Sequence, residues 1–315
     1  MIARHWPHLA LVAALLLSAG LALAAPELDD YAVNILVLAG INIILAASLN
    51  LVNGHTGQFS LGHAGFMAVG AYASSMITLA LGPAATAGWG GQVAFLGALV
   101  IGGGLAAIFG FFVGVPSLRL RGDYLAIVTL GFGEIIRVII QNTNALGGAR
   151  GLAGIPPLTN LFWTFAWAAL TIYTIAALVN STYGRGFLAV RDDEIAAESV
   201  GISTTRYKVT AFVIGAFFAG VAGGLYAHFI SFIAPEGFNF LKSVDVVVMV
   251  ILGGMGSTPG VVAAAILLTL LNEMLRDLEQ YRMVIFALLL IVLMIVRPQG
   301  LLGNFRRKLR KPASR

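Results

Sequence analysis

Side chains that could act as acids, bases, nucleophiles or metal ligands are few in this chain and are not grouped for catalysis. The histidines are His5 and His8 near the start, His55 and His63 in a glycine-rich segment, and His228 in an apolar run. They form no HExxH motif, and neither a nucleophile elbow nor a paired-carboxylate motif occurs. Cysteine is absent, which excludes disulfide, thiol and cysteine–zinc chemistry. The sequence therefore predicts no catalytic residue and no metal site.

ATP binding by this chain is not expected either. A Walker A loop ends in a lysine followed by serine or threonine, after the pattern GxxxxG. None of the lysines stands in such a loop: Lys208, Lys242, Lys308 and Lys311. We therefore expect no cofactor here, and ATP hydrolysis, if it drives the protein, belongs to another subunit.

Charged residues inside the apolar runs occur mainly as opposite charges three residues apart. This spacing lets two side chains on one helix face form a pair. Pairing is expected because an isolated charge at the centre of a membrane helix costs about 2.5–3.5 kcal/mol. We interpret them as structural pairs rather than a proton relay: Glu134 with Arg137, Lys242 with Asp245, and Glu273 with Arg276.

A polar loop at residues 181–208 interrupts the apolar pattern most strongly. Asp192 or Asp193 is placed to cap a short helix, and Ala196 and Ala197 favour that helix. Gly201 is a suitable stop, and Ser203 is placed to cap a following helix that enters the membrane near Val209. This order favours a docking surface for a partner outside the bilayer. A solvated connector is the alternative, although connectors rarely need a capped helix.

Two glycine-rich segments, 53–70 and 252–260, also interrupt apolar runs, one in each half of the chain. Interrupted segments in corresponding positions indicate an internal pseudo-repeat with a transport pathway at its interface. The alternative is a pair of tight turns, with His63 packed in the interior rather than contacting a ligand. The residues predicted to line the pathway are Gly57, Ser60, Gly62, His63, Gly65, Gly254, Gly256 and Ser257.

Composition identifies the surrounding solvent as lipid. Hydrophobic residues make up 59% of the 315 positions and charged residues only 10%, against about 25% charged in soluble domains. Because a membrane helix needs about 20 apolar residues, we predict an all-α polytopic protein with about ten spans, or eight. The spans lie near 8–25, 31–52, 63–82, 93–115, 123–141, 161–180, 209–233, 243–253, 259–275 and 283–297, the eighth being short enough to join the ninth as a broken or re-entrant element.

Basic residues predict how the chain lies in the membrane. Most of the 19 Lys and Arg residues fall on one side if both termini and the loop at 181–208 are cytoplasmic. Residues 298–315 then form a basic cytoplasmic tail of a single membrane domain spanning 1–315. The first span also resembles a cleavable signal peptide, and we favour a retained span. The net charge of +5 gives no reason to expect nucleic-acid binding.

Four segments, taken together and in order, carry a family resemblance. They are GHTGQFSLGHAGFMAVGAY at 54–72, RLRGDYLAIVTLGFGEIIR at 119–137, GRGFLAVRDDEIAAESVGIS at 184–203 and LGGMGSTPGVVAA at 252–264. Over nearly the whole chain, this sequence resembles the LivM-type permeases of branched-chain amino acid ABC importers.

The resemblance implies a translocation subunit in the bacterial inner membrane. Its partners would be a second, homologous permease, two cytoplasmic ATPases that bind ATP and Mg, a periplasmic binding protein, membrane lipid, and the substrates leucine, isoleucine and valine. Related permeases carry urea, short amides or aromatic acids, so these substrates stay open.

The resemblance also implies a coupling role for the loop at 181–208. Glu194, Ala196, Ala197 and Gly201 match the coupling motif often written EAA…G, and Arg191 and Asp193 adjoin it. The match is incomplete, because Ile195 occupies the strict Glu position and the later Leu-Pro ending is missing.

Two rival hypotheses follow from the residues. The interrupted segments and Glu134 also fit an ion-coupled carrier that works without other subunits, although no unpaired carboxylate is evident in the middle of a span. A membrane-embedded enzyme is disfavoured because no catalytic constellation is present.

Overall fold

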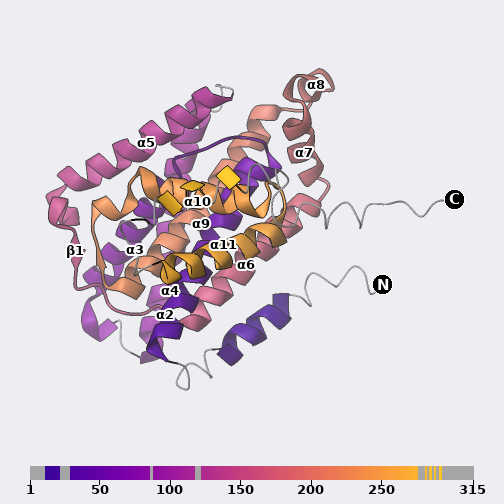
Figure 1. The fold of residues 1–315 in the computed structure, drawn as a ribbon. Coiled ribbons are helices and arrows are strands. Elements are labelled where there is room, and N and C mark those ends of the chain that lie inside the picture. The colour runs from indigo at the N-terminus through magenta and orange to yellow at the C-terminus, as the bar shows by residue number, and fades with distance from the viewer. Residues whose placement is uncertain are drawn as a thin grey trace.

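Apolar helices account for nearly all of the chain that the structure, a computed structural model, describes (Figure 1). The described residues are 11–21, 29–85, 88–117 and 122–275, with 281, 284–285, 287–288 and 291–292. Within them, six helical segments are long and apolar enough to cross a bilayer. They are α2 (Asp30–Asn50) with its π-helical extension η2 (Leu51–His55), α3 (His63–Ala85), α4 (Gly88–Ser117), α5 (Asp123–Asn142), α6 (Leu161–Asn180) and α9 (Thr204–Ile230).

These six helices confirm an all-α polytopic membrane protein, and they match the spans predicted at 31–52, 63–82, 93–115, 123–141, 161–180 and 209–233. A count of about ten is not confirmed. The first predicted span, 8–25, contains a short helix, Leu11–Leu21. Of the tenth predicted span, 283–297, the structure describes only the helical residues 284–285, 287–288 and 291–292, and the basic tail, 298–315, lies outside the described residues.

The predicted eighth and ninth spans form one broken element, as the short apolar run at 243–253 indicated. α10 (Phe240–Gly253) has 14 residues, a length of about 21 Å, whereas the hydrocarbon core measures about 30 Å. A turn at Gly254–Ser257 joins α10 to α11 (Thr258–Met274), and the two helices pack against each other. We call this pair the α10–α11 hairpin.

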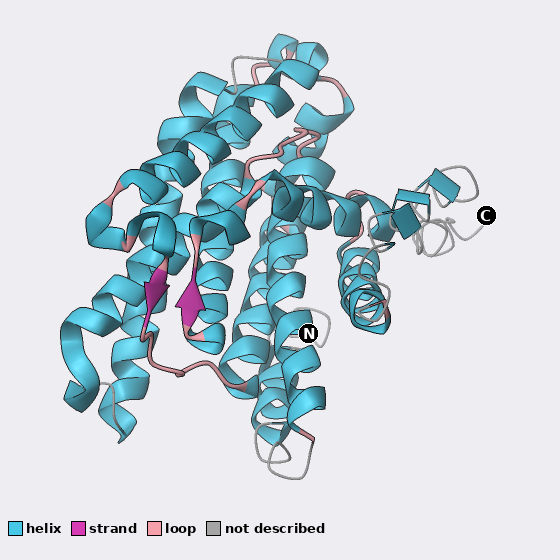
Figure 2. Cartoon of the chain, turned by 60° about the vertical axis from the view of Figure 1, so that its left-hand side comes forward, coloured by secondary structure: helices cyan, strands magenta, loops and turns pink. Residues whose placement is uncertain are grey.

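The two ends of the bundle differ in structure (Figure 1). At the end that we call the α8 end, the short helices α7 (Gly184–Asp192) and α8 (Glu194–Ser199) project from the bundle. At the opposite end, the strand end, β1 (Leu152–Ala153) pairs antiparallel with β2 (Phe232–Ile233), with Leu152 opposite Ile233 (Figure 2). Short 3-10 turns complete that end: η3 (Asn144–Leu146), η4 (Gly148–Arg150) and η5 (Pro235–Phe238).

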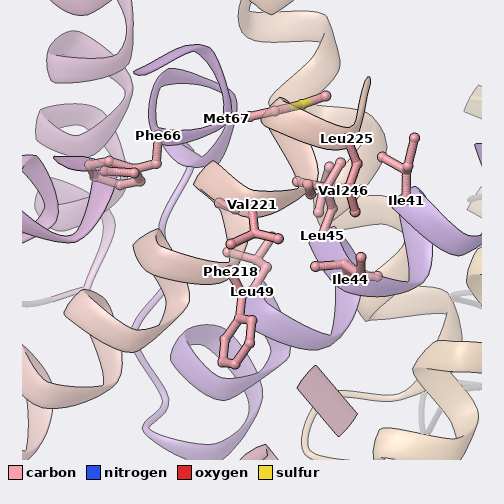
Figure 3. Close-up of a cluster of buried hydrophobic side chains, with 14 of the residues drawn as sticks. Ile41, Ile44, Leu45, Leu49, Phe66, Met67, Phe218, Val221, Leu225 and Val246 are labelled. Carbon is pink, nitrogen blue, oxygen red and sulfur yellow. The ribbon is translucent and has the colours of Figure 1, made fainter. Parts of the chain in front are cut away.

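The core forms where α2, α3, α9 and α10 meet (Figure 3). Its members are apolar side chains almost fully withdrawn from the surface, among them Leu45, Leu49, Phe66, Met67, Phe218, Val221, Leu225 and Val246. Because lipid is as apolar as these side chains, their burial gives little hydrophobic advantage, and close packing must hold the helices together.

Glycine contacts supply that close packing. α9 packs against both α3 and α4. Gly70 on α3 lies against the backbone of Gly220 on α9, and Gly223, one turn further along α9, lies against the carbonyl of Met67. None of these three glycines has room for a Cβ atom. The spacing of α3 and α9 therefore depends on these glycines.

Replacing Gly223 with alanine tests this dependence. We expect Gly223→Ala to lower the free energy of unfolding by about 1–3 kcal/mol, because the added methyl group forces α9 away from Met67. Gly104→Ala on α4 is the matched control, since a Cβ at Gly104 meets no heavy atom within 4 Å. Thermal unfolding of the purified protein in detergent compares the variants, and equal melting temperatures would contradict the packing argument.

Candidate functional site

The short helix α8 is capped as the sequence predicts. The Asp193 side chain accepts hydrogen bonds from the backbone N–H groups of Ile195 (2.9 Å) and Ala196 (3.0 Å). Gly201 follows α8 with φ of 84°, a conformation that suits glycine. One detail of the prediction is wrong: Ser203 stands at the N-cap of α9, but its side chain makes no capping hydrogen bond, and α9 begins at Thr204. The sequence prediction also missed α7, which precedes α8 as a separate helix.

Charged and polar contacts fix α8 to the start of α9. Lys208 Nζ lies 2.5 Å from Glu194 Oε1, and the lysine is only 5% exposed. Thr204 Oγ1 donates to Glu198 Oε1 at 2.7 Å. A buried lysine must be paired to remain charged without a large penalty. The Lys208–Glu194 pair therefore makes α8 move with the membrane helix α9.

Aromatic side chains fix α7 to the bundle. Phe187 packs edge-to-face on both Tyr183 and Tyr207, with ring centroids 5.5 Å apart in each case. It is fully buried and belongs to a cluster with Leu51, where α2 changes into the π-helical turn. α7 therefore contacts α9 and the broken end of α2 together.

The outer surface of α8 carries exposed apolar side chains. Ile195 is 67% exposed and Val200 is 75% exposed, whereas Ala197 is buried beneath them. Ala196 is exposed beside Ile195. Exposed apolar groups on a fixed helix are typical of a contact surface for another protein. Among the residues predicted for coupling, Ala197 thus supports the helix from below, while Ala196 lies on its outer surface.

The two glycine-rich interruptions meet inside the bundle. Gly54 in η2 lies directly against the backbone of Gly256 in the hairpin turn, so neither a Cβ atom nor any larger group fits at Gly54. The Gly256 N–H donates to Asn50 Oδ1 at 2.8 Å. Irregular backbone at membrane depth requires such internal partners. We call this contact the break junction.

Arg191, at the end of α7, touches both sides of the break junction. A Cβ added to Gly57 would lie 3.0 Å from Arg191 Cγ, and one added to Gly256 would lie 3.3 Å from Arg191 Nη1. A cavity of about 360 Å³ separates the segment Thr56–Phe59 from the α7–α8 junction and includes Arg191, Glu194 and Lys208 in its lining. The same guanidinium forms an ion pair of 2.8 Å with the exposed Asp192. Arg191 therefore connects the projecting helices with the interrupted ones.

Other residues predicted for the pathway make close packing contacts. Gly62 lies against the backbone of Thr129 and Gly65 against that of Gly133, both on α5. His63 is 3% exposed, and its Nε2 lies 2.9 Å from Ser48 Oγ. These contacts fit a packed histidine; whether this segment also lines a pathway stays a prediction.

The remaining predicted positions lie beside the break junction. The Ser60 N–H donates to Asn53 Oδ1 at 3.2 Å. Gly254 and Ser257 bound the hairpin turn, where the Ser257 N–H donates to the Gly254 carbonyl. Ser257 is buried. Gly57 belongs to the N-terminal half of the sequence, and Gly254, Gly256 and Ser257 belong to the C-terminal half. The structure brings these four residues together.

Buried amide groups near the break junction were missed by sequence analysis. Among the described residues, Nδ2 of Asn50, Nδ2 of Asn53 and both side-chain amide atoms of Gln58 are buried without a hydrogen-bond partner. An unsatisfied buried group costs about 1–3 kcal/mol, so each of these groups calls for a structural or functional explanation. The available signal was the Asn50–Asn53 spacing within an apolar run.

The predicted ion pairs are partly confirmed. Arg137 Nε lies 2.7 Å from Glu134 Oε2 on α5. Asp245 interacts electrostatically with Lys242 on α10. The third pair involves Arg276, which lies outside the described residues.

In the part of the chain that the structure describes, no group of three or more His, Asp or Glu residues is placed to hold a metal ion.

Comparison with known proteins then decides the family. The family of branched-chain amino acid transport system permease components matches residues 31–295. This chain belongs to that family. The match covers all the helices from α2 to α11, including the break junction and α7–α8.

Several curated relatives are similar over most of the chain. The LivM permease protein of the high-affinity branched-chain amino acid transport system of Escherichia coli K12 is 39% identical over 280 residues, which are 78% of this chain and 64% of that protein. The LivH permease protein of the same system is 30% identical over 75% of this chain and 82% of its own length. The autoinducer 2 import permease LsrC of Yersinia pseudotuberculosis is 27% identical over 64% of this chain and 60% of its own length.

The chain spans less than two thirds of the length of its LivM relative. No solved structure matches it.

Removing the positive charge of Lys208 tests the attachment of α8. We expect Lys208→Met to lower the free energy of unfolding by about 3–5 kcal/mol, because Glu194 then stays partly buried without its cation. Asp192→Asn is the matched control: its pair with Arg191 is exposed, so its loss should cost less than about 1 kcal/mol. Denaturant unfolding in detergent separates the two, and equal effects would show that the Lys208 pair has no special role.

Proposed function

We propose that this chain is a permease subunit of an ATP-driven importer in the bacterial inner membrane, and that it carries branched-chain amino acids. The observation that carries the proposal is the apolar outer surface of α8, which is fixed to α9 and connected to the break junction. An apolar surface of this kind would bind a partner protein whose movement is passed on to the membrane helices. The sequence has no Walker A loop, so in this proposal the partner binds ATP and Mg.

In this proposal α8 docks on a cytoplasmic ATPase. Ile195 and Val200 insert into a groove of the ATPase, and the Glu194–Lys208 pair carries its movement into α9. Arg191 carries the movement into the break junction. The α8 end and both chain termini then lie on the cytoplasmic side, in agreement with the distribution of basic residues.

The other partners follow from family membership and from the named relatives. LivM and LivH are separate permease proteins of one transport system in Escherichia coli, which supports a pairing of this chain with a second, homologous permease. The complete importer would also contain two ATPases and a periplasmic binding protein that delivers the substrate. None of the residues proposed here acts as a catalyst, and the chain is a translocation subunit rather than an enzyme.

A different small solute is the second candidate. The observation that favours it is the similarity to LsrC, whose name assigns it to import of a signalling molecule rather than an amino acid. The same fold would then carry urea, an amide or an aromatic acid. Competition of unlabelled solutes with labelled leucine, in vesicles that contain the full assembly, distinguishes these substrates.

A charge on the outer surface of α8 tests the docking proposal. We expect Ile195→Asp to reduce both ATP-dependent leucine uptake and substrate-stimulated ATP hydrolysis by about tenfold or more, since a carboxylate in an apolar groove costs more than 1.4 kcal/mol. Ala145→Asp, on the exposed loop at the strand end, is the control for a new surface charge.

Both variants are measured in vesicles that contain this chain, the second permease, the ATPases and the periplasmic binding protein. Wild-type coupling by Ile195→Asp would exclude docking through α8. Leucine uptake by this chain alone, driven by an ion gradient, would replace the whole proposal with an ion-coupled carrier.

A further inference from the structure

A further cavity lies toward the strand end of the bundle and is lined by α2, α9 and the α10–α11 hairpin. Its volume is about 370 Å³, near the lower end of the roughly 300–1,000 Å³ that is usual for small-molecule sites. Lys242, close to the start of α10, and Glu273, close to the end of α11, both line it. The cavity therefore lies at the open end of the hairpin, away from the turn at Gly254–Ser257.

One wall of the cavity is aliphatic. Ile35, Leu38 and Ile41 lie three residues apart along α2 and so share one helix face. Ile230, at the end of α9, adds a fourth branched side chain. A wall of this kind gains about 0.8 kcal/mol for each methylene that a ligand buries against it.

The α10–α11 hairpin brings charges of both signs to the cavity. Lys242 comes from α10 and Glu273 from α11, so the hairpin brings a cation and an anion to one cavity. Asp245 interacts electrostatically with Lys242, but an ammonium group has three donors and can serve a carboxylate ligand as well. Ionisable groups that line a cavity in a membrane domain are commonly functional.

Uncharged polar groups of α2 and α11 also line the cavity. Asn42 Nδ2 donates to Thr269 Oγ1 at 2.9 Å, and that hydroxyl donates to the Ala265 carbonyl at 2.7 Å. This chain of bonds fixes the Asn42 amide with its nitrogen toward α11. The amide oxygen is then the atom that can accept a hydrogen bond from a ligand.

We infer that this cavity is a substrate site within the membrane domain, and that it takes an α-amino acid with an aliphatic side chain. The carboxylate of the ligand binds Lys242, its ammonium group binds Glu273 and the Asn42 oxygen, and its side chain packs on the Ile35–Leu38–Ile41 face. The inference rests on the proposed transport function and names its site and substrate class. Urea and simple amides carry no full charges and so would not form ion pairs with Lys242 and Glu273.

The position of the cavity also suits a transport cycle. α10 and α11 form two of its walls, and their shared turn lies in the break junction that Arg191 contacts. Movement applied to α7–α8 therefore reaches the cavity through the hairpin. The described lining of this cavity contains none of the pathway residues predicted from the sequence, such as Gly57 and Ser60. The cavity is therefore a second location on the proposed transport pathway.

Protection from thiol modification tests the site directly. The chain has no cysteine, so Asn272→Cys in the cavity wall introduces one thiol into it. A cationic methanethiosulfonate reagent is applied to the full assembly, without the binding protein, and modification of this chain is followed. We expect saturating leucine to slow modification about tenfold or more, as a well-occupied site does. Ala145→Cys, on the exposed loop, should react at one rate with and without leucine.

Charge-removing variants test the assignment of the two ligand ends. In the Asn272→Cys background, we expect Lys242→Gln and Glu273→Gln each to raise the leucine concentration needed for protection by about tenfold. Lys242→Gln should also reduce the advantage of leucine over leucinamide, which lacks the carboxylate. Glu273→Gln should reduce its advantage over 4-methylpentanoate, which lacks the ammonium group. Glu134→Gln, on α5 outside the cavity, is the matched control.

The outcomes separate this inference from the proposed function. Equal modification with and without leucine, in an assembly that imports leucine, would overturn the site and leave the function standing. Protection by leucine in an assembly that imports another solute would retain the site and contradict the proposed substrate. Protection that Lys242→Gln and Glu273→Gln leave unchanged, in variants that assemble normally, would overturn the assigned binding mode.

Discussion

Two interrupted helices meet backbone to backbone at Gly54 and Gly256, and the arrangement of the domain depends on this contact. A helix that breaks within a membrane leaves polar backbone groups that lipid cannot satisfy. Here the Asn50 side chain accepts from Gly256 N–H, and the absence of a Cβ at Gly54 allows the close approach. The requirement explains why glycine stands at the point where the two segments meet.

The same contact links both ends of the protein. At the α8 end, Phe187 and Arg191 of α7 rest on the broken end of α2 and on the hairpin turn. Toward the strand end, the hairpin carries Lys242 and Glu273 into a cavity with an aliphatic wall. A movement of α7–α8 thus has a continuous packed route to the proposed substrate site. Asn50, Asn53 and Gln58 lie along this route and carry buried amide atoms without hydrogen-bond partners.

Sequence periodicity and composition predicted the long helices and the capped helix α8, because apolar length and capping are local properties. Two features were beyond that reasoning. The meeting of Gly54 with Gly256 joins segments about 200 residues apart, and only the folded chain shows that Arg191 covers both. The cavity likewise combines residues of α2, α9, α10 and α11 that form no motif. The charges of Lys242 and Glu273 were noticed in the sequence, but only as partners of their neighbours on the same helix.

The most direct test of the account is a distance measurement between α8 and the hairpin turn. Spin labels at Ser199→Cys and Met255→Cys, both exposed positions in a chain without cysteine, report this distance by pulsed electron resonance in the full assembly. Because Arg191 joins α7 to the turn, we predict one narrow distribution that is the same in the ATP-free and nucleotide-trapped states. A distance that changes between the two states would show that α7–α8 moves independently of the break junction and would contradict the account.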